Sequence, residues 1–447
     1  MFDFLSYVPL IGGTLTFLVP FIIVLSIVIF IHEFGHYIVG RWCGIHAEAF
    51  SMGFGPVLKT WTDKRGTRWQ IAALPFGGFV KFLGDANAAS GNADRSAIDA
   101  MPESLRARTF EAAALWKRAL TVFAGPGANF ILSIVIFGLI AVGSGRPSGD
   151  LVVGEIKSIP GEAIGLRSGD LIKTFNGKPV TRWQDFEDFK YRAGEDSTPT
   201  YGVLRDGEEQ SVSGPFPWLP IVSSVNPVTP AAKAGVKKDD LVVMLDGKAI
   251  TSFFELQTIV QQMTSREVVM KVLRGTEVID LNITPRAMAY EKDDGSFGER
   301  MMIGIGAGLS VSPVYETVGL LGALDAGVGS VWHLAKVFVR TITELVTGGL
   351  SVKNLQGPVG IAVASGDSAS QGPLELVFMI AFISTAIGLM NLLPIPILDG
   401  GHLVIFAYQA IFRRAPSDRA LQVAMGVGLS LLLMLMIFAT FNDIMRL

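Results

Sequence analysis

Four long apolar stretches limit what this chain can fold into more than any other feature of its sequence. A hydrocarbon layer about 30 Å thick needs roughly 20 helical residues to cross it. Backbone polar groups in lipid must be satisfied within the segment itself, so each stretch is expected to be a helix. The four predicted spans are residues 4–31, 119–142, 376–398 and 420–442. The first has no basic segment before it, which favours a span over a cleaved signal peptide.

The composition agrees with a membrane protein. Half of the 447 residues are hydrophobic, 17% are charged and the mean hydropathy is +0.45, which is high for the alternative, a soluble protein with buried helices. The net charge of −3 includes no basic block that could neutralise a run of phosphates, so no nucleic-acid partner is expected. The single cysteine, Cys43, excludes an intramolecular disulfide and a cysteine-type zinc site.

Positive charges between the spans predict how the chain crosses the lipid bilayer. The connection at 41–118 carries eleven Lys or Arg residues, and the one between the last two spans carries Arg413, Arg414 and Arg419. Cytoplasmic loops are enriched in these residues, so both connections are predicted to be cytoplasmic. Both termini and residues 143–373 then lie outside, in the periplasm of a Gram-negative cell.

An internal repeat occupies most of the predicted outer region. Sliding the sequence by about 70 residues aligns Asn176-Gly177-Lys178 with Asp246-Gly247-Lys248, and Leu204-Arg205 with Leu273-Arg274. Each copy reads as short strands, a tight turn and a helix, a pattern that resembles PDZ domains over residues 150–286. Neither copy has a Gly-Leu-Gly-Phe loop, so a spacer or steric role stays open beside the binding of an extended peptide.

Residues 331–345 predict an amphipathic helix after the repeats. His333, Lys336, Arg340 and Glu344 fall near one face, and apolar side chains fall largely on another. This helix is expected to lie on the membrane or against the repeats, with a buried core helix as the alternative.

The motif His32-Glu33-Phe34-Gly35-His36 continues the first span. At 3.6 residues per turn, His32 and His36 project from one helix face with Glu33 beside them. This arrangement is typical of two zinc ligands and a general base. Ionisable groups at the end of a span are tolerated mainly when they are paired, bound to metal or facing a polar cavity. The sequence therefore predicts a catalytic zinc site near the cytoplasmic side.

The predicted third zinc ligand is Asp399. It is the only carboxylate after Glu375 in the third apolar stretch, and Pro394 and Pro396 break the helix so that the backbone can turn. This end of the span is also predicted to be cytoplasmic, at the same depth as His36. His402 is the alternative ligand, or it supports Asp399 from behind.

Residues 54–82 predict a β-hairpin. Strands at 57–61 and 68–74 flank the turn Asp63-Lys64-Arg65-Gly66. If the zinc site hydrolyses peptide bonds of a membrane-embedded helix, that helical substrate must first be unwound, because its peptide groups are hydrogen-bonded within the helix. A strand edge at Ile71 is expected to bind the unwound backbone. The alternative is a hairpin that only packs against the lipid surface.

Together these motifs resemble the site-2 protease family of intramembrane zinc metalloproteases, and most closely its bacterial members with tandem PDZ domains. The resemblance covers almost the whole chain and includes Gly125-Pro126-Gly127-Ala128-Asn129-Phe130, Asn354-Leu355-Gln356-Gly357-Pro358 and residues 391–401. It implies that His32, His36 and Asp399 bind one zinc ion, that Glu33 is the base, and that a β-loop re-enters the membrane near the site.

Asn129 and Asn391 match asparagines of the same motifs. An amide in a membrane span is unfavourable unless its hydrogen bonds are satisfied. Each is therefore expected either to hydrogen-bond the substrate backbone or to join two helices.

The predicted fold class is a polytopic α-helical membrane protein with four transmembrane helices, a membrane-associated β-hairpin and two periplasmic PDZ-like α/β domains. The predicted segments are the first transmembrane helix (1–42), a cytoplasmic or membrane-reentrant β region (43–116), the second transmembrane helix (117–143), two PDZ-like domains (144–214 and 215–290), a linker with the amphipathic helix (291–373), the third transmembrane helix (374–412) and the fourth (413–447).

The predicted function is cleavage of transmembrane segments of single-span proteins in the bacterial inner membrane. The resemblance suggests a trimmed anti-sigma factor as substrate, in the regulated proteolysis of an envelope stress response. The PDZ-like domains would screen substrates. The rival hypothesis is a membrane scaffold or chaperone with no working metal, and zinc content distinguishes the two.

Overall fold

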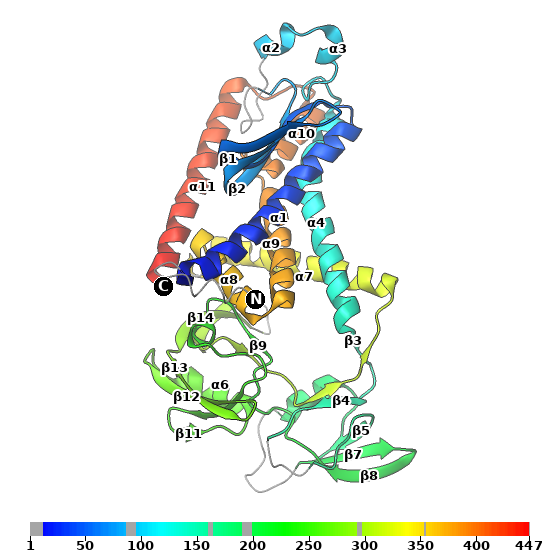
Figure 1. The fold of residues 1–447 in the computed structure, drawn as a ribbon, viewed down its shortest axis with the longest axis vertical. Helices are drawn as coiled ribbons and strands as arrows, with labels where there is room; N and C mark the ends of the chain where they lie inside the picture. Colours follow the sequence, from blue (N-terminus) through cyan, green and yellow to red (C-terminus); the bar gives the residue numbers. More distant parts are fainter. Residues whose placement is uncertain are drawn as a thin grey trace. The chain divides into compact units, whose positions relative to one another are not determined.

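The helix α1 (Gly12–Trp42) carries the His-Glu-Phe-Gly-His motif and lies among the other long helices (Figure 1). The computed structural model describes residues 12–85, 95–159, 164–189, 199–292, 297–352 and 355–446, so the first eleven residues of the predicted first segment lie outside it. The chain forms two units. The helix unit comprises Met1–Ile140, Gly322–Thr343 and Leu355–Leu447, and the sheet unit comprises Ala141–Leu321 and Glu344–Asn354.

Four helices in the described part of the chain are long and apolar enough to cross a membrane, as predicted. They are Thr14–Trp42 within α1, Leu115–Ser144 (α4), Pro373–Asn391 (α9) and Arg419–Met445 within α11 (Asp418–Arg446). The third ends at Asn391 rather than at residue 398, because residues 392–398 turn back before α10 (Asp399–Phe412) begins. This turn contains both prolines of the motif.

Small residues let the helices approach closely. A Cβ on Gly35 of α1 would lie 2.2 Å from the carbonyl oxygen of Ala124 in α4. The crossing of α4 with α7 (Leu320–Thr347) depends on two glycines in the same way. Gly138 of α4 faces a carbonyl oxygen of α7, and Gly327 of α7 faces a carbonyl oxygen of α4. Close contact through small residues is typical of helix packing in membranes.

The helix α8 (Pro358–Gln371) was not predicted. It packs against α1, α9 and α11, and its first turn is capped by the buried carboxylate of Asp443 from α11. The backbone N–H groups of Gly357 and Gly360 donate to Asp443 Oδ2 at 2.9 and 2.7 Å, where a negative charge complements the helix dipole. Residues 355–371, predicted to be part of an outer linker, therefore belong to the helix unit, as does most of α7.

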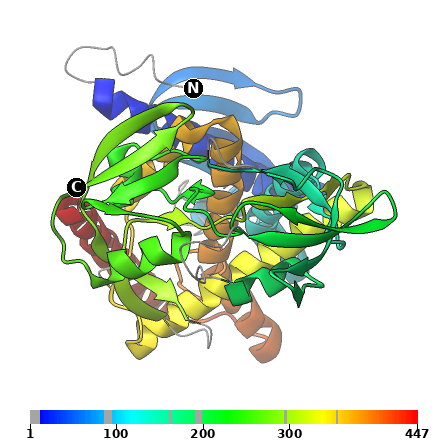
Figure 2. The ribbon, with the colours of Figure 1, turned by 90° about the horizontal axis from the view of Figure 1, so that it is seen from below.

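The predicted hairpin is a sheet folded on itself. Its strands β1 (Ala47–Thr62) and β2 (Arg68–Phe82) form a long ribbon beside α1 (Figure 2). Both strands bend, so residues 47–52 pair with the start of β2 on one side and with residues 78–82 on the other. Ile71 pairs with both Met52 and Lys59, so the prediction that it offers a free edge is wrong. Two edges have no strand beside them in the described chain, residues 57–62 and residues 78–82, and the edge at 78–82 lines the cavity described below.

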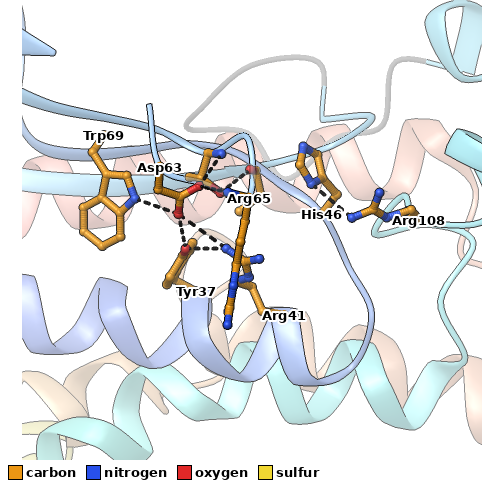
Figure 3. Close-up of polar contacts among 9 residues, drawn as sticks. Tyr37, Arg41, His46, Asp63, Arg65, Trp69 and Arg108 are labelled. Atoms are coloured by element: carbon orange, nitrogen blue, oxygen red, sulfur yellow. Dashed lines mark hydrogen bonds and ion pairs between the residues drawn. The ribbon is translucent and has the colours of Figure 1, made fainter. Parts of the chain in front are cut away.

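The turn of this sheet is anchored to α1 by the carboxylate of Asp63 (Figure 3). Its Oδ2 accepts hydrogen bonds from Tyr37 Oη at 3.0 Å and Trp69 Nε1 at 3.3 Å, and it lies 3.5 Å from Arg41. Its Oδ1 accepts from two backbone N–H groups of the turn. Burial raises the pKa of Asp63, but these hydrogen bonds outweigh it and hold the pKa below its ordinary value.

The sheet unit contains two four-stranded antiparallel sheets with equivalent strand orders, β6-β5-β7-β8 and β11-β10-β12-β13. The aligned positions of the repeat form the same ion pair. Arg205 donates to Asp170 and Arg274 to Asp240, each through two bonds of 2.7–2.8 Å. The strands are β5 (Leu171–Phe175), β6 (Lys178–Pro179), β7 (Thr200–Arg205), β8 (Glu208–Ser213), β10 (Leu241–Leu245), β11 (Lys248–Ala249), β12 (Val268–Arg274) and β13 (Glu277–Ile283).

Residues 305–316, predicted to lie in the linker, pair with segments that precede the two four-stranded sheets. Three short strands there pair with strands that precede each sheet: β16 (Ile305–Gly306) with β9 (Ser224–Val225), β17 (Val311–Pro313) with β4 (Val153–Ile156), and β18 (Tyr315–Glu316) with β3 (Arg146–Pro147). The remaining elements are α2 (Arg95–Asp99), α3 (Glu103–Arg106), the 3-10 helix η2 (Trp183–Phe189), α5 (Pro230–Ala234), α6 (Phe253–Gln262), β14 (Arg286–Glu291) and β15 (Phe297–Met302).

Replacing Asp63 by Ala is expected to lower the free energy of unfolding by about 1–2 kcal/mol, because several donors lose a shared acceptor. Thermal unfolding in detergent measures this loss. The difference from wild type should shrink on acidification, since a carboxyl with a depressed folded pKa contributes stability above its unfolded pKa and loses it as the pH falls through the folded value. Lys64→Ala, an exposed change in the same turn, is the control and should have little effect.

Candidate metal centre

Three side chains predicted to bind zinc meet at one point. His32 and His36 come from α1, and Asp399 is the first residue of α10. The distances are 3.2 Å between the two Nε2 atoms, 3.2 Å from His32 Nε2 to Asp399 Oδ2, and 3.4 Å from His36 Nε2 to the same oxygen. Among the described residues this is the group of His, Cys, Asp and Glu side chains close enough to hold a metal ion.

The spacing of these atoms fits a tetrahedral ion. Ligands bound at about 2.0–2.1 Å in a tetrahedron lie roughly 3.3 Å from one another. Asp399 Oδ2 is also buried without a hydrogen-bond partner of acceptable geometry, although two imidazole nitrogens lie beside it. A buried oxygen in that position is unfavourable unless a cation satisfies it. The donor set and its geometry therefore fit zinc.

A backbone carbonyl group orients the His36 ring so that its Nε2 atom is available to bind a metal ion. Its Nδ1 donates to the carbonyl oxygen of Thr121 at 2.9 Å, so Nε2 keeps the lone pair that a metal requires. The ring lies directly against Gly125 of α4, where a Cβ would come within 2.2 Å of Nε2. The sequence did not reveal these two contacts, although Gly125 stands in a motif that it did identify.

Asn129 supports the second histidine. Its amide lies 3.2 Å from His32 Nδ1, and the side chain is fully buried. Ligation through Nε2 leaves the proton on Nδ1, which then needs an acceptor. Asn129 Oδ1 is buried and finds no partner in the described chain, and a half-turn of the amide presents it to Nδ1. With no exposed surface, Asn129 joins α4 to α1, the second of its two predicted roles, and is not placed to bind substrate.

The turn before Asp399 is shaped by two glycines. A Cβ on Gly400 would lie 2.3 Å from the carbonyl oxygens of Leu392 and Leu393, and one on Gly401 would lie 2.2 Å from that of Ile395. The segment after α9 can therefore fold back over the start of α10 only with glycine at these positions. This close approach directs Asp399 towards the two histidines.

A cavity of about 360 Å³ opens beside the metal ligands. Glu33 lines it, together with Val80 of β2. Asn391 lines it as well, and its Nδ2 donates to the carbonyl oxygen of Ile387 at 3.1 Å. His402 is part of the same wall but lies outside the group of three ligands. Ile71 lines a smaller cavity of about 110 Å³ that shares Glu33.

Asp85 is a cavity residue that the sequence did not single out. Its Oδ2 accepts a hydrogen bond from the backbone N–H of Phe82 at 2.9 Å. Burial raises the pKa of Asp85 to about 7, although this hydrogen bond and nearby Lys81 act in the opposite direction. A third carboxylate therefore lines the cavity, in addition to Glu33 and Asp399.

The comparison with known families agrees with this geometry. The model of peptidase family M50 matches residues 20–435. This chain belongs to peptidase family M50. The predicted site-2 protease family is thereby confirmed, and the protein is a zinc metalloprotease.

Three relatives cover nearly the whole chain of this M50 peptidase. A protein of Agrobacterium fabrum named as a zinc metalloprotease is 36% identical over 97% of both chains. Metalloprotease MmpA of Caulobacter vibrioides is 31% identical over 97% of this chain and 96% of its own. The regulator of sigma-E protease RseP of Salmonella typhimurium is 31% identical over 96% of this chain and 98% of its own.

Replacing Asn129 by Ala is expected to weaken zinc binding about 10- to 100-fold, because His32 loses the acceptor that orients its ring. Titration with a competing chelator, followed by metal analysis, measures this change. Asn391→Ala is the matched control, since Asn391 lines the cavity without contacting a predicted zinc ligand in the structure, and it should bind zinc as the wild type does. Equal zinc affinity in all three proteins would contradict the role of Asn129.

Proposed function

We propose that this chain is an intramembrane endopeptidase that cleaves transmembrane segments of single-span membrane proteins. The observation that carries the proposal is the position of the metal ligands. His32 and His36 lie within Thr14–Trp42, a helix apolar and long enough to cross a membrane, and the cavity beside them opens onto Glu33. A hydrolytic site inside such a segment suits substrates that are themselves embedded in lipid.

The proposed chemistry divides between the metal and the protein. His32, His36 and Asp399 would hold zinc, which would supply Lewis acidity towards the scissile carbonyl and towards water. Glu33 accepts the proton of the attacking water and returns it to the leaving amine. Asn391, which lines the same cavity, offers an amide to the substrate backbone.

The free edge of the β1–β2 sheet supplies what an unwound substrate needs. A helix segment that opens in lipid exposes polar backbone groups, each unfavourable by several kcal/mol unless it is paired. Residues 78–82 run along the cavity wall, with Gly78, Phe79, Val80 and Phe82 among its lining residues. Pairing with this edge would hold the substrate extended beside Glu33. The proposed binding strand is thus 78–82 rather than the inner strand that contains Ile71.

The sheet unit is proposed to screen substrates outside the membrane. Its two sheets are interpreted as PDZ-like domains that lie in the periplasm when the chain is inserted in the inner membrane. The basic residues at 41–118 favour the cytoplasm for the connection that carries them, and the sheet unit then lies on the opposite side of the membrane. The name of the Salmonella relative supports a trimmed anti-sigma factor as the first candidate substrate. Labelling of a cysteine placed at Gly207 by an impermeant reagent, without labelling at Lys64, tests this orientation.

Glu33→Gln should abolish most hydrolysis, on the order of 10²- to 10⁴-fold, because an amide cannot accept the proton of water. Zinc content and thermal stability should stay close to wild type. The experiment compares membrane-protein fragments by mass spectrometry between cells that express the wild type and the variant. If both strains accumulate the same fragments, the chain does not hydrolyse these substrates and a scaffold role takes its place.

Val80→Pro should remove most cleavage while zinc remains bound, because proline removes a main-chain N–H with which the substrate would pair and disrupts the edge. Val80→Ile keeps the main chain and should be nearly silent. Both enzymes are assayed on a helical substrate and on one loosened by glycine near the scissile bond, which should be cut faster since unwinding is easier. Wild-type rates for Val80→Pro on both substrates would mean that the edge only packs.

A further inference from the structure

The strand at 78–82 presents its main-chain groups alternately to β1 and to the cavity. The N–H of Leu83 donates to the carbonyl oxygen of His46, which precedes β1, at 2.8 Å. Successive residues of a strand face opposite neighbours, so Phe82, Val80 and Gly78 face away from β1. One hydrogen bond agrees with this phase, because the N–H of Phe82 donates to Asp85 on the side away from β1.

Asp85 occupies the last of these three positions in the manner of a neighbouring strand. The chain turns sharply after Phe82, with Gly84 at a φ of +92°. The backbone N–H of Asp85 then donates to the Phe82 carbonyl oxygen at 3.1 Å, while Asp85 Oδ2 accepts from the Phe82 N–H at 2.9 Å. Both outward main-chain groups of Phe82 are thus taken by one residue. A substrate strand can pair with Val80 and Gly78 but not with Phe82.

The strand itself sets the distance between Glu33 and the residue at which pairing ends, Phe82. Val80 lines the cavity with Glu33, and Phe82 lies two residues further on, about 6.7 Å along the strand. Phe82 and Asp85 line the same cavity as Glu33 and the three metal ligands. Pairing of the substrate backbone with this strand therefore ends at a fixed residue, Phe82, close to the peptide bond that is to be cut.

We propose that Asp85 is a positioning residue that ends the row of pairing groups on this edge and thereby selects which peptide bond of the substrate faces Glu33. The inference rests on the proposed function. Asp85 acts through the bond to Phe82 and touches no reacting atom. Its role requires an acceptor at Oδ2 rather than a negative charge.

Removal of the Asp85 side chain, which occupies the Phe82 N–H, has a specific consequence. Side chains of a strand alternate between two faces, so a paired substrate can slide by two residues and keep its faces, whereas a slide by one reverses them. Freeing the Phe82 N–H lengthens the row at one end only. An enzyme without the Asp85 side chain should therefore produce a second cut, two residues from the normal one and on one side of it.

The test uses the full-length enzyme in proteoliposomes with a single-span reporter, and maps the cut by mass spectrometry. Asp85→Ala should yield the displaced product at on the order of a tenth of the total, since one hydrogen bond changes a population by up to about tenfold. Asp85→Asn keeps an oxygen that can accept from Phe82 and should cut as the wild type does. Asp99→Ala replaces an exposed aspartate of α2 and is the matched control.

Zinc content and thermal stability are measured for each variant, and Asp85→Ser replaces Asp85→Ala if the latter loses zinc. A single unshifted cut in the variant without an acceptor overturns the inference, whatever its rate. It is also overturned if Asp85→Asn produces the displaced cut, because the charge would then be responsible. Failure of the proposed function is distinct, since the wild type would then leave the reporter intact.

Discussion

The close approach of α1 to α4 is the constraint on which the metal centre depends. Gly35 leaves room for the Ala124 carbonyl, and Gly125 leaves room for the ring of His36; a Cβ at either position would come within 2.2 Å of its neighbour. At this separation, Thr121 and Asn129 of α4 reach the Nδ1 atoms of the two histidines. Both rings then direct Nε2 towards Asp399. A site built on two touching helices is held more rigidly than one built on loops.

The β1–β2 sheet is the second support of the site. Tyr37 and Phe50 are buried in one apolar cluster between α1 and this sheet, and Asp63 ties its turn to Tyr37 and Arg41. These contacts place the strand at 78–82 against Glu33, where Gly78 leaves only 3.1 Å between an added Cβ and the Glu33 side chain. The proposed base and the proposed substrate-binding edge therefore share one frame, and the orientation of one depends on the other.

Several parts of this architecture could not be predicted because their partners are distant in sequence. The hairpin has the expected turn, but pairing of residues 47–52 with two segments of β2 follows no local pattern. The strands at 305–316 are two or three residues long and acquire their structure from strands some 80 to 170 residues earlier in the chain, as β-pairing allows. Asn129 gave an ambiguous signal, since an amide in an apolar helix suits a substrate contact as well as a helix contact.

The sequence by itself determined the membrane-crossing helices and predicted the three residues that meet as a candidate metal centre, because these depend on hydrophobic length, the spacing of His32 and His36 on one helical turn, and a carboxylate at a proline-broken helix end. Such signals are local and survive without knowledge of the fold. Only the tertiary structure decided which strand faces the cavity, that Asn129 meets His32 rather than the cavity, and that Asp85 hydrogen-bonds the main chain of Phe82 at the end of the edge. Those features rest on register and on contacts between 3 and 97 residues apart, where a shift of one residue reverses which groups face the site.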